Sequence, residues 1–316
     1  MPSALTPLER AILEALIYSD IFEHPLRLDE LHRYLPIHAE KGELISALNS
    51  LNGQVETKED YYFLAERGQI MDIRKQREER SRKLMPIALR YGHILGSLPF
   101  ICMVALTGSL AVLNVSKNAD FDYMLVAKRG RVWIARVLAL VVNRVARLFG
   151  YELCPNLIVS ETALEWPLHD LYSARELVQM IPIAGMDVYR KLIQVNEWAK
   201  ELLPNVSIAP GGSVTRQHDG LRSSWSRLVE FSLRSKLGDK LEAWEMTRKI
   251  ARFSKQPGFG EETIFTAEVC QGNFHHHRKW THQVFQERLN KLSIDFSLAK
   301  GEGLGRRTEP VEVVRA

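Results

Sequence analysis

The sequence predicts a mixed α/β (α+β) fold in which a mixed sheet is flanked by helices. Three observations support this prediction. Apolar runs of strand length lie just before Gly108, just after Asp120 and at 157–159, and amphipathic helical segments separate the later ones. A small module of three helices and a hairpin precedes this region. Helical spacing then returns over residues 221–295, which predicts a helical C-terminal region.

Residues 1–66 have the sequence features of a winged-helix module. Thr6, Pro7 and Glu9 predict the start of a first helix, because a cap threonine and a glutamate three residues later satisfy backbone amides. Further helices are expected at 28–34 and 40–51, and a hairpin at 55–57 and 61–64. The module contains five Lys/Arg and twelve Asp/Glu, a balance of −7. Since DNA binding needs a basic surface, a packing or protein-contact role is favoured over a DNA-binding regulator.

Two basic segments follow this module. Residues 67–90 carry eight Lys/Arg and three acids, and they predict a linker helix. Ion pairs at i,i+4 spacing on a solvated helix explain these charges, and a basic wall beside a phosphate site is the alternative. Residues 128–147 carry six basic residues and no acid, with an amphipathic helix expected over 132–149. Lys128, Arg129 and Arg131 follow a carboxylate-bearing strand and are candidates for phosphate contacts, with solvated loop charge as the alternative.

The main chemical signal lies between Gly108 and Asp122. Gly108-Ser109 ends one apolar run, and Asp120-Phe121-Asp122 begins the next one after ten residues. Alternate residues of a strand share a face, so Asp120 and Asp122 are expected side by side. Two such carboxylates repel each other unless a cation lies between them, and Mg²⁺ prefers oxygen ligands. A Gly-Ser turn at a strand end offers backbone amides to an anion, and the two elements together predict phosphoryl or nucleotidyl transfer.

These residues resemble the signature of the DNA polymerase beta-like nucleotidyltransferase superfamily, which is a hydrophobic strand, Gly-[Gly/Ser], a short spacer and Asp-x-[Asp/Glu]. The chain is also similar to an uncharacterised prokaryotic group in which a winged-helix-like segment precedes this core. The resemblance covers residues 5–205 and implies a nucleotidyltransferase-like core with a helical extension at 91–205. It implies that Asp120 and Asp122 bind up to two Mg²⁺ ions, and that Gly108 and Ser109 bind the phosphates of an NTP.

Members of this superfamily use a further Asp or Glu on a later strand to activate the acceptor hydroxyl. The corresponding segment here contains Glu152, Asn156 and Glu161. Glu152 has hydrophobic neighbours and is the catalytic candidate, although it stands near the start of the expected strand. Asn156 cannot act as a base, and Glu161 is expected in a turn after the strand. Because no residue fits this position well, a catalytically silent nucleotide-binding sensor is the alternative to an enzyme.

The composition indicates the setting of the protein. Its 316 residues are 46% hydrophobic and 25% charged, which is ordinary for a globular chain that is long enough for two domains. The net charge of +4 is too small to imply a polyanionic partner. Three cysteines without paired spacing indicate a reduced, cytoplasmic setting, and the first residues do not resemble a signal peptide. Residues 94–116 lack charge, but polar residues and glycines interrupt them, so a buried strand and no membrane partner are expected.

The C-terminal third carries weaker signals. Residues 161–203 are expected to form three helical pieces separated by prolines, 205–220 a connector, and 300–316 a disordered tail. Cys270 and the histidines at 275–277 and 282 are potential zinc ligands, but Arg278 and Lys279 would repel a cation, so an exposed helix start near 276 is favoured.

The chain is therefore expected to be a cytoplasmic, Mg²⁺-dependent nucleotidyltransferase. It would transfer NMP from an NTP to an unidentified hydroxyl or phosphate acceptor on a small molecule, nucleic acid or protein.

Overall fold

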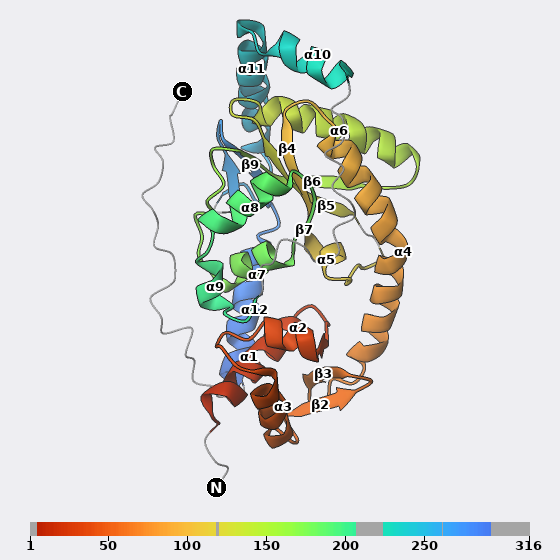
Figure 1. The fold of residues 1–316 in the computed structure, drawn as a ribbon, viewed down its shortest axis with the longest axis vertical. Coiled ribbons are helices and arrows are strands. Elements are labelled where there is room, and N and C mark those ends of the chain that lie inside the picture. The colour runs from red at the N-terminus through yellow and green to blue at the C-terminus, as the bar shows by residue number, and fades with distance from the viewer. Residues whose placement is uncertain (1–4, 118–119, 207–223, 261, 292–316) are drawn as a thin grey trace.

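A six-stranded mixed sheet lies at the centre of the molecule, with helices on both faces, and this confirms the predicted mixed α/β class. The structure is a computed structural model that describes residues 5–117, 120–206, 224–260 and 262–291 (Figure 1). The N-terminal module lies at one end of the molecule, and the long helix α4 (Ile70–Gly96) runs from it to the sheet (Figure 1). The tail predicted at 300–316 and the connector from residue 207 onward lie outside the described residues.

The N-terminal module has the predicted three helices and hairpin, with a short additional strand. The cap of the first helix forms as expected, since the Glu9 backbone N–H donates to Thr6 Oγ1 at 3.2 Å and the Thr6 N–H donates to Glu9 Oε2 at 2.7 Å. The three strands form an antiparallel sheet in the order β1-β3-β2. The elements are α1 (Pro7–Asp20), β1 (Leu26–Arg27), α2 (Leu28–Arg33), α3 (Lys41–Ser50), β2 (Val55–Lys58) and β3 (Tyr61–Leu64).

The basic side chains of α4 bind the N-terminal module and the loop after residue 111, in addition to forming ion pairs along the helix. Pairs at i,i+4 spacing are present, as predicted, between Arg82 and Glu78 and between Lys83 and Glu79, each at 2.6 Å. Arg74, however, is almost completely buried and donates to Glu30 Oε1 of α2 at 2.9 Å. The interpretation of a purely solvated helix is therefore incomplete, because these charges also join the module to the core.

The central sheet has the strand order β7-β4-β5-β6-β9-β8. The strands β5 and β6 run parallel, and the other neighbouring pairs are antiparallel. A parallel pair needs a crossover connection, and α6 (Val132–Leu148) provides it. The strands are β4 (Ile101–Leu106), β5 (Phe121–Ala127), β6 (Leu153–Ser160), β7 (Ile181–Ala184), β8 (Thr263–Phe265) and β9 (Val269–Gly272).

The two faces of the sheet pack on different helices, and this separation determines where the polar residues lie. One face packs on α4 and α6, and Tyr123 of β5 points there, since its hydroxyl donates to the Ala88 carbonyl at 2.7 Å. The opposite face packs on α7 (Leu171–Gln179) and α8 (Met186–Val195) through residues such as Met124 and Leu177. Because side chains alternate along a strand, Asp122 points toward the α7 face.

The prediction of three helical pieces over 161–203 was incomplete, and the C-terminal region is not wholly helical. The helices α7, α8 and α9 (Ala199–Leu202) form, but Pro182 lies in the strand β7 instead of ending a helix. Proline is accepted there because β7 is an edge strand. The hairpin β8–β9 interrupts the C-terminal helices α10 (Ser224–Leu233), α11 (Lys236–Phe253) and α12 (His277–Lys291), and it covers the outer edge of β6.

The uncharged segment 94–116 contains the end of α4, the strand β4 and the short helix α5 (Gly108–Ala111), so the predicted buried strand is confirmed. Within the described residues, no helix combines the length and the apolar character that crossing a membrane requires. All three cysteines of the sequence lie in the described part of the chain, where none of them is joined to another by a disulfide bond.

Candidate functional site

The antiparallel pairing of β4 and β5 brings the Gly-Ser and Asp-x-Asp elements together. Leu106 at the end of β4 pairs with Tyr123, and the next residue, Thr107, donates its backbone N–H to the Asp122 carbonyl at 2.9 Å. The helix α5 begins one residue later at Gly108. The pairing of β4 with β5 therefore places Gly108 beside the start of β5.

Gly108 lies directly against the side chain of Asp122. Its φ is +64°, a conformation that residues with a Cβ atom rarely adopt, and a Cβ at this position would lie 2.3 Å from Asp122 Oδ2. A larger residue would therefore displace the carboxylate. Glycine is therefore needed at this position for the observed placement of the Asp122 carboxylate.

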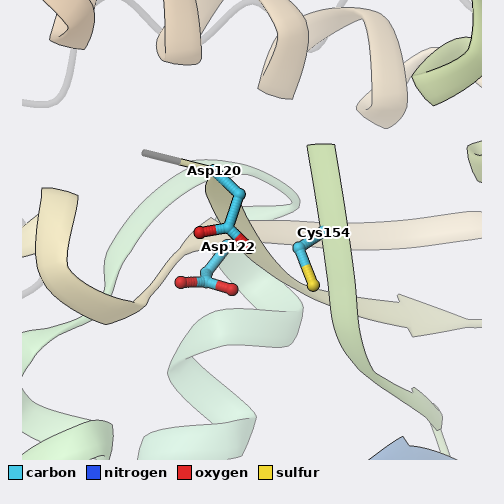
Figure 2. A group of neighbouring side chains, drawn as sticks. All are labelled: Asp120, Asp122 and Cys154. Atoms are coloured by element: carbon cyan, nitrogen blue, oxygen red, sulfur yellow. The ribbon is translucent and has the colours of Figure 1, made fainter. Parts of the chain in front are cut away.

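Asp120, Asp122 and Cys154 form a cluster of potential metal ligands (Figure 2). One ligand atom from each residue lies within 4.8 Å of the others. Asp120 is exposed and precedes β5, Asp122 is half-buried within β5, and Cys154 is half-buried on β6. Cys154 joins the cluster because the parallel register pairs it with Asp122, which places both side chains on the same face.

The protonation of Asp122 reflects its acidic surroundings. Burial and the negative charges of Asp120 and Glu176 raise its pKa from 3.8 to about 8. Hydrogen bonds from Cys154 and Asn156 oppose this rise, and the Asn156 Nδ2 group donates to Asp122 Oδ1 at 3.1 Å. Burial and the neighbouring aspartates likewise raise the pKa of the Cys154 thiol. Both charged groups that shift the pKa of Asp122 are negative, so a divalent cation would stabilise its ionised form.

The helix α7 contributes an acidic residue that the sequence did not identify. Glu176 is half-buried, and burial raises its pKa to about 7. Its charge acts on Asp122, so it lies close enough to belong to the electrostatic environment of the site. The sequence did not single out Glu176, because it stands in a helical segment whose pattern indicates packing. Its neighbours on the buried face of α7 include Ala174, Arg175 and Leu177.

Glu152, the predicted catalytic residue, lies at the edge of this cluster. It is exposed, precedes β6, and forms an ion pair with Arg147 of α6. Its backbone carbonyl accepts a hydrogen bond from the Phe121 N–H at 2.9 Å, so its main chain supports the start of β5. Glu161 lies in the turn after β6, as expected. Thus the β6 residue that faces Asp122 across the register is Cys154.

The structure does not bring Lys128, Arg129 and Arg131 to the carboxylates. Asp122 lies near the start of β5 and Lys128 follows its end, so the six-residue separation amounts to about 20 Å in an extended strand. Lys128 lies 4.0 Å from Glu230, and Arg131 binds Asp239 at 2.9 Å. Lys128 and Arg131 therefore contact α10 and α11 at the opposite end of the strand, and the backbone N–H of Arg129 donates to Glu161 Oε1 at 3.4 Å.

Ser109 is exposed and follows Gly108 in α5. The first residue of α12, His277, lies close enough to Asp120 for their charges to interact. The helix begins at His277, which confirms the predicted helix start near 276. Burial and His275 lower the pKa of His277, whereas Glu262 and Asp120 raise it. Glu262 accepts hydrogen bonds from the backbone of α12, including the Lys279 N–H at 2.7 Å. The charge of Asp120 thus affects the pKa of His277, which is more than 150 residues away in the sequence.

Comparison of the chain with protein-family models, with curated proteins and with solved structures gave no match. The function must therefore be inferred from the geometry of the site.

Proposed function

We propose that the protein is a divalent-metal-dependent nucleotidyltransferase that transfers NMP from an NTP to a hydroxyl or phosphate acceptor. In this proposal residues 91–205 form a DNA polymerase beta-like core, and residues 1–66 form a winged-helix-like module. The observation that supports it is the convergence of Asp120 and Asp122 with Gly108, on strands whose pairing gives this arrangement a structural cause. The resemblance in sequence and the geometry lead to the same residues by separate routes.

The donor set of the site fits a divalent metal ion. Asp120 and Asp122 offer carboxylate oxygens a short distance apart, and the raised pKa of Asp122 shows that its charge lacks compensation in the protein alone. When bound, the metal ion supplies positive charge to the phosphates and lowers the pKa of an acceptor hydroxyl. Asp120 and Asp122 hold this ion, Gly108 and Ser109 offer backbone amides to the phosphates, and Asn156 orients Asp122 through its amide.

The proposed reaction is tested with radiolabelled NTPs, Mg²⁺ or Mn²⁺, and a panel of acceptors. Asp120→Ala and Asp122→Ala are expected to abolish product formation, because both remove a carboxylate from the metal position. Glu152→Ala serves as the matched control, since it removes an exposed carboxylate that is paired with Arg147. Equal loss of activity in all three variants would instead assign a catalytic role to Glu152. Product formation that survives Asp122→Ala would contradict the proposed site.

A catalytically silent nucleotide sensor remains the second candidate, because the β6 residue opposite Asp122 is a cysteine instead of a carboxylate. Nucleotide binding that depends on Asp122, without product under any of these conditions, would establish the sensor and contradict the transferase.

No observation favours the DNA-binding regulator. Lys41 at the start of α3 is paired with Asp29 at 2.6 Å, and residues 1–66 retain their balance of −7. We expect the full chain to show no salt-sensitive binding to duplex DNA.

A further inference from the structure

The position of Cys154 has a consequence for the identity of the metal. The strand β6 runs parallel to β5, and Cys154 pairs with Asp122 in this register. Its sulfur and one oxygen each of Asp120 and Asp122 lie within 4.8 Å of one another (Figure 2). The thiol also hydrogen-bonds to the Asp122 carboxylate. A sulfur atom therefore stands beside the two carboxylates, at the place where a further ligand to the same ion would lie.

A second, independent observation concerns a buried polar side chain on the same face. Thr107 is 6% exposed, and its Oγ1 atom is buried without a hydrogen-bond partner. It lies opposite Asp122 in the pairing that continues from Leu106 and Tyr123, so its side chain is on the same face as Asp122. A buried hydroxyl without a partner costs free energy, and a metal-bound water or substrate oxygen at this face would satisfy it.

We propose that Asp120, Asp122 and Cys154 form a mixed oxygen–sulfur site that selects a softer divalent transition metal ion, such as Co²⁺ or Zn²⁺, over Mg²⁺. Mg²⁺ requires hard oxygen ligands in near-octahedral geometry and gains little from sulfur. Thiolate ligands favour softer ions, and the affinity of mixed sites rises along the transition series. The inference rests on the proposed function for the position of the ion, and it extends that proposal to the identity of the ion.

Binding of the ion exchanges one bond for another. The Cys154 S–H bond breaks, the sulfur donates an electron pair to the metal, and the proton passes to the solvent: Cys–SH + M²⁺ → Cys–S⁻–M²⁺ + H⁺. The oxidation states of sulfur and metal do not change, so the step needs no oxidant or reductant.

The test is a titration of the full metal-free chain with Co²⁺ in the absence of nucleotide. A near-ultraviolet charge-transfer absorption from sulfur to cobalt is expected in the wild-type protein. Cys154→Ser is expected to abolish this absorption. Cys102→Ser is the matched control and is expected to retain it, because Cys102 is a half-buried thiol of β4 that lies outside the cluster. Cobalt binding without the absorption in the wild-type chain would overturn the inference.

Metal selectivity gives a second readout. Cys154→Ser is expected to weaken the binding of Zn²⁺ or Cd²⁺ about tenfold or more, because the loss of even an outer-shell partner typically lowers metal affinity by about tenfold to a hundredfold. The same variant is expected to change Mg²⁺ binding little. Cys154→Asp is expected to shift the preference toward Mg²⁺, because it adds a hard oxygen ligand. Unchanged selectivity in both variants would overturn the inference. If the variants fail to fold, the wild-type chain is alkylated with and without Zn²⁺. Zn²⁺ is expected to protect Cys154, but not Cys102, from alkylation. Equal alkylation of both cysteines in the presence of Zn²⁺ would overturn the inference.

These results separate the two proposals. The charge-transfer absorption without any nucleotide turnover supports the mixed site and contradicts the transferase. Turnover with Mg²⁺ that depends on Asp122, in a chain that shows no sulfur–metal absorption, supports the transferase and contradicts the mixed site.

Discussion

Burial and the negative charges of Asp120 and Glu176 oppose the ionisation of Asp122, and this links its protonation to the stability of the protein. Its pKa rises from 3.8 to about 8 in the folded chain. Between these values the folded chain retains a proton that the unfolded chain has released. The stability of the metal-free protein therefore falls as the pH rises from about 4 to about 8, and this effect is constant at higher pH.

Asp122→Asn should remove this pH dependence, because asparagine resembles the protonated aspartate. In the metal-free protein, its unfolding temperature is expected to exceed that of the wild type increasingly from pH 4 to pH 8. One pKa unit of this rise, about a quarter of the whole, corresponds to about 1.4 kcal/mol in the free energy of unfolding. Thermal unfolding across this pH range is the measurement, with Asp187→Asn on the exposed part of α8 as the control. Parallel pH profiles for Asp122→Asn and the wild type would contradict the interpretation.

Individual residues of the site differ in how well the sequence predicts them. Asp120 and Asp122 are predictable because their proximity follows from the period of one strand. Cys154 is not, because its place beside Asp122 depends on the register between two strands that are joined by α6. Glu152 has suitable neighbours in the sequence, but β6 begins one residue after it. Glu176 comes from α7, and only tertiary packing brings it near the sheet.

At the scale of secondary structure, the short helix α5 positions Asp122 through Gly108. Gly108→Ala is expected to destabilise the protein and to weaken metal binding, because the new methyl group displaces Asp122 Oδ2. The strained φ costs about 1 kcal/mol, and the overpacking adds about 1–3 kcal/mol.

Gly130→Ala provides a matched control for this prediction. Gly130 has a similar φ of +68°, and a Cβ there meets no atom within 4 Å. Gly130→Ala should therefore lose only the stability that the positive φ costs a residue with a Cβ atom, and it should bind metal as the wild type does. Thermal unfolding and Mn²⁺ titration of both variants make the comparison, and equal metal affinity in the two would show that Gly108 does not position Asp122.

The strands that the sequence did not predict form by pairing with other strands of the sheet. The strand β7 has four residues and contains Pro182, and it forms by pairing with β4. The hairpin β8–β9 pairs with β6 and covers an edge that would otherwise be open. Longer elements such as α4 and α6 follow from their own periodicity, so their existence was predicted even where α4 extends six residues beyond the expected end.

At the scale of the whole molecule, α4 couples the N-terminal module to the loop that follows α5. Arg74 binds Glu30 of α2 and His24, and its Nη1 group lies 3.5 Å from the Val112 carbonyl. Burial and the charge of Arg74 hold the pKa of His24 well below its usual value, so this histidine stays neutral. Arg77 adds a bond of 2.8 Å to the Phe22 carbonyl. The module is thus tied to the segment that leads from Gly108 to Asp120.

Arg74→Ala is expected to destabilise the protein by about 3–5 kcal/mol, because it leaves buried partners without their charge. Cleavage by a protease at the junction of the module and α4 should accelerate accordingly. Lys83→Ala breaks an exposed pair with Glu79 and should change the stability little, because solvent screens both charges. Chemical denaturation with limited proteolysis compares the two, and similar stability losses would contradict the proposed coupling.

The most direct measurement of the metal site is a crystal structure of the protein soaked with Mn²⁺ and a non-hydrolysable NTP, with the metal located by its anomalous signal. We predict a Mn²⁺ peak about 2.0–2.6 Å from carboxylate oxygens of Asp120 and Asp122, with the triphosphate at Gly108 and Ser109. Metal and nucleotide bound elsewhere, with no peak between Asp120 and Asp122 at saturating concentrations, would contradict the assignment of this site.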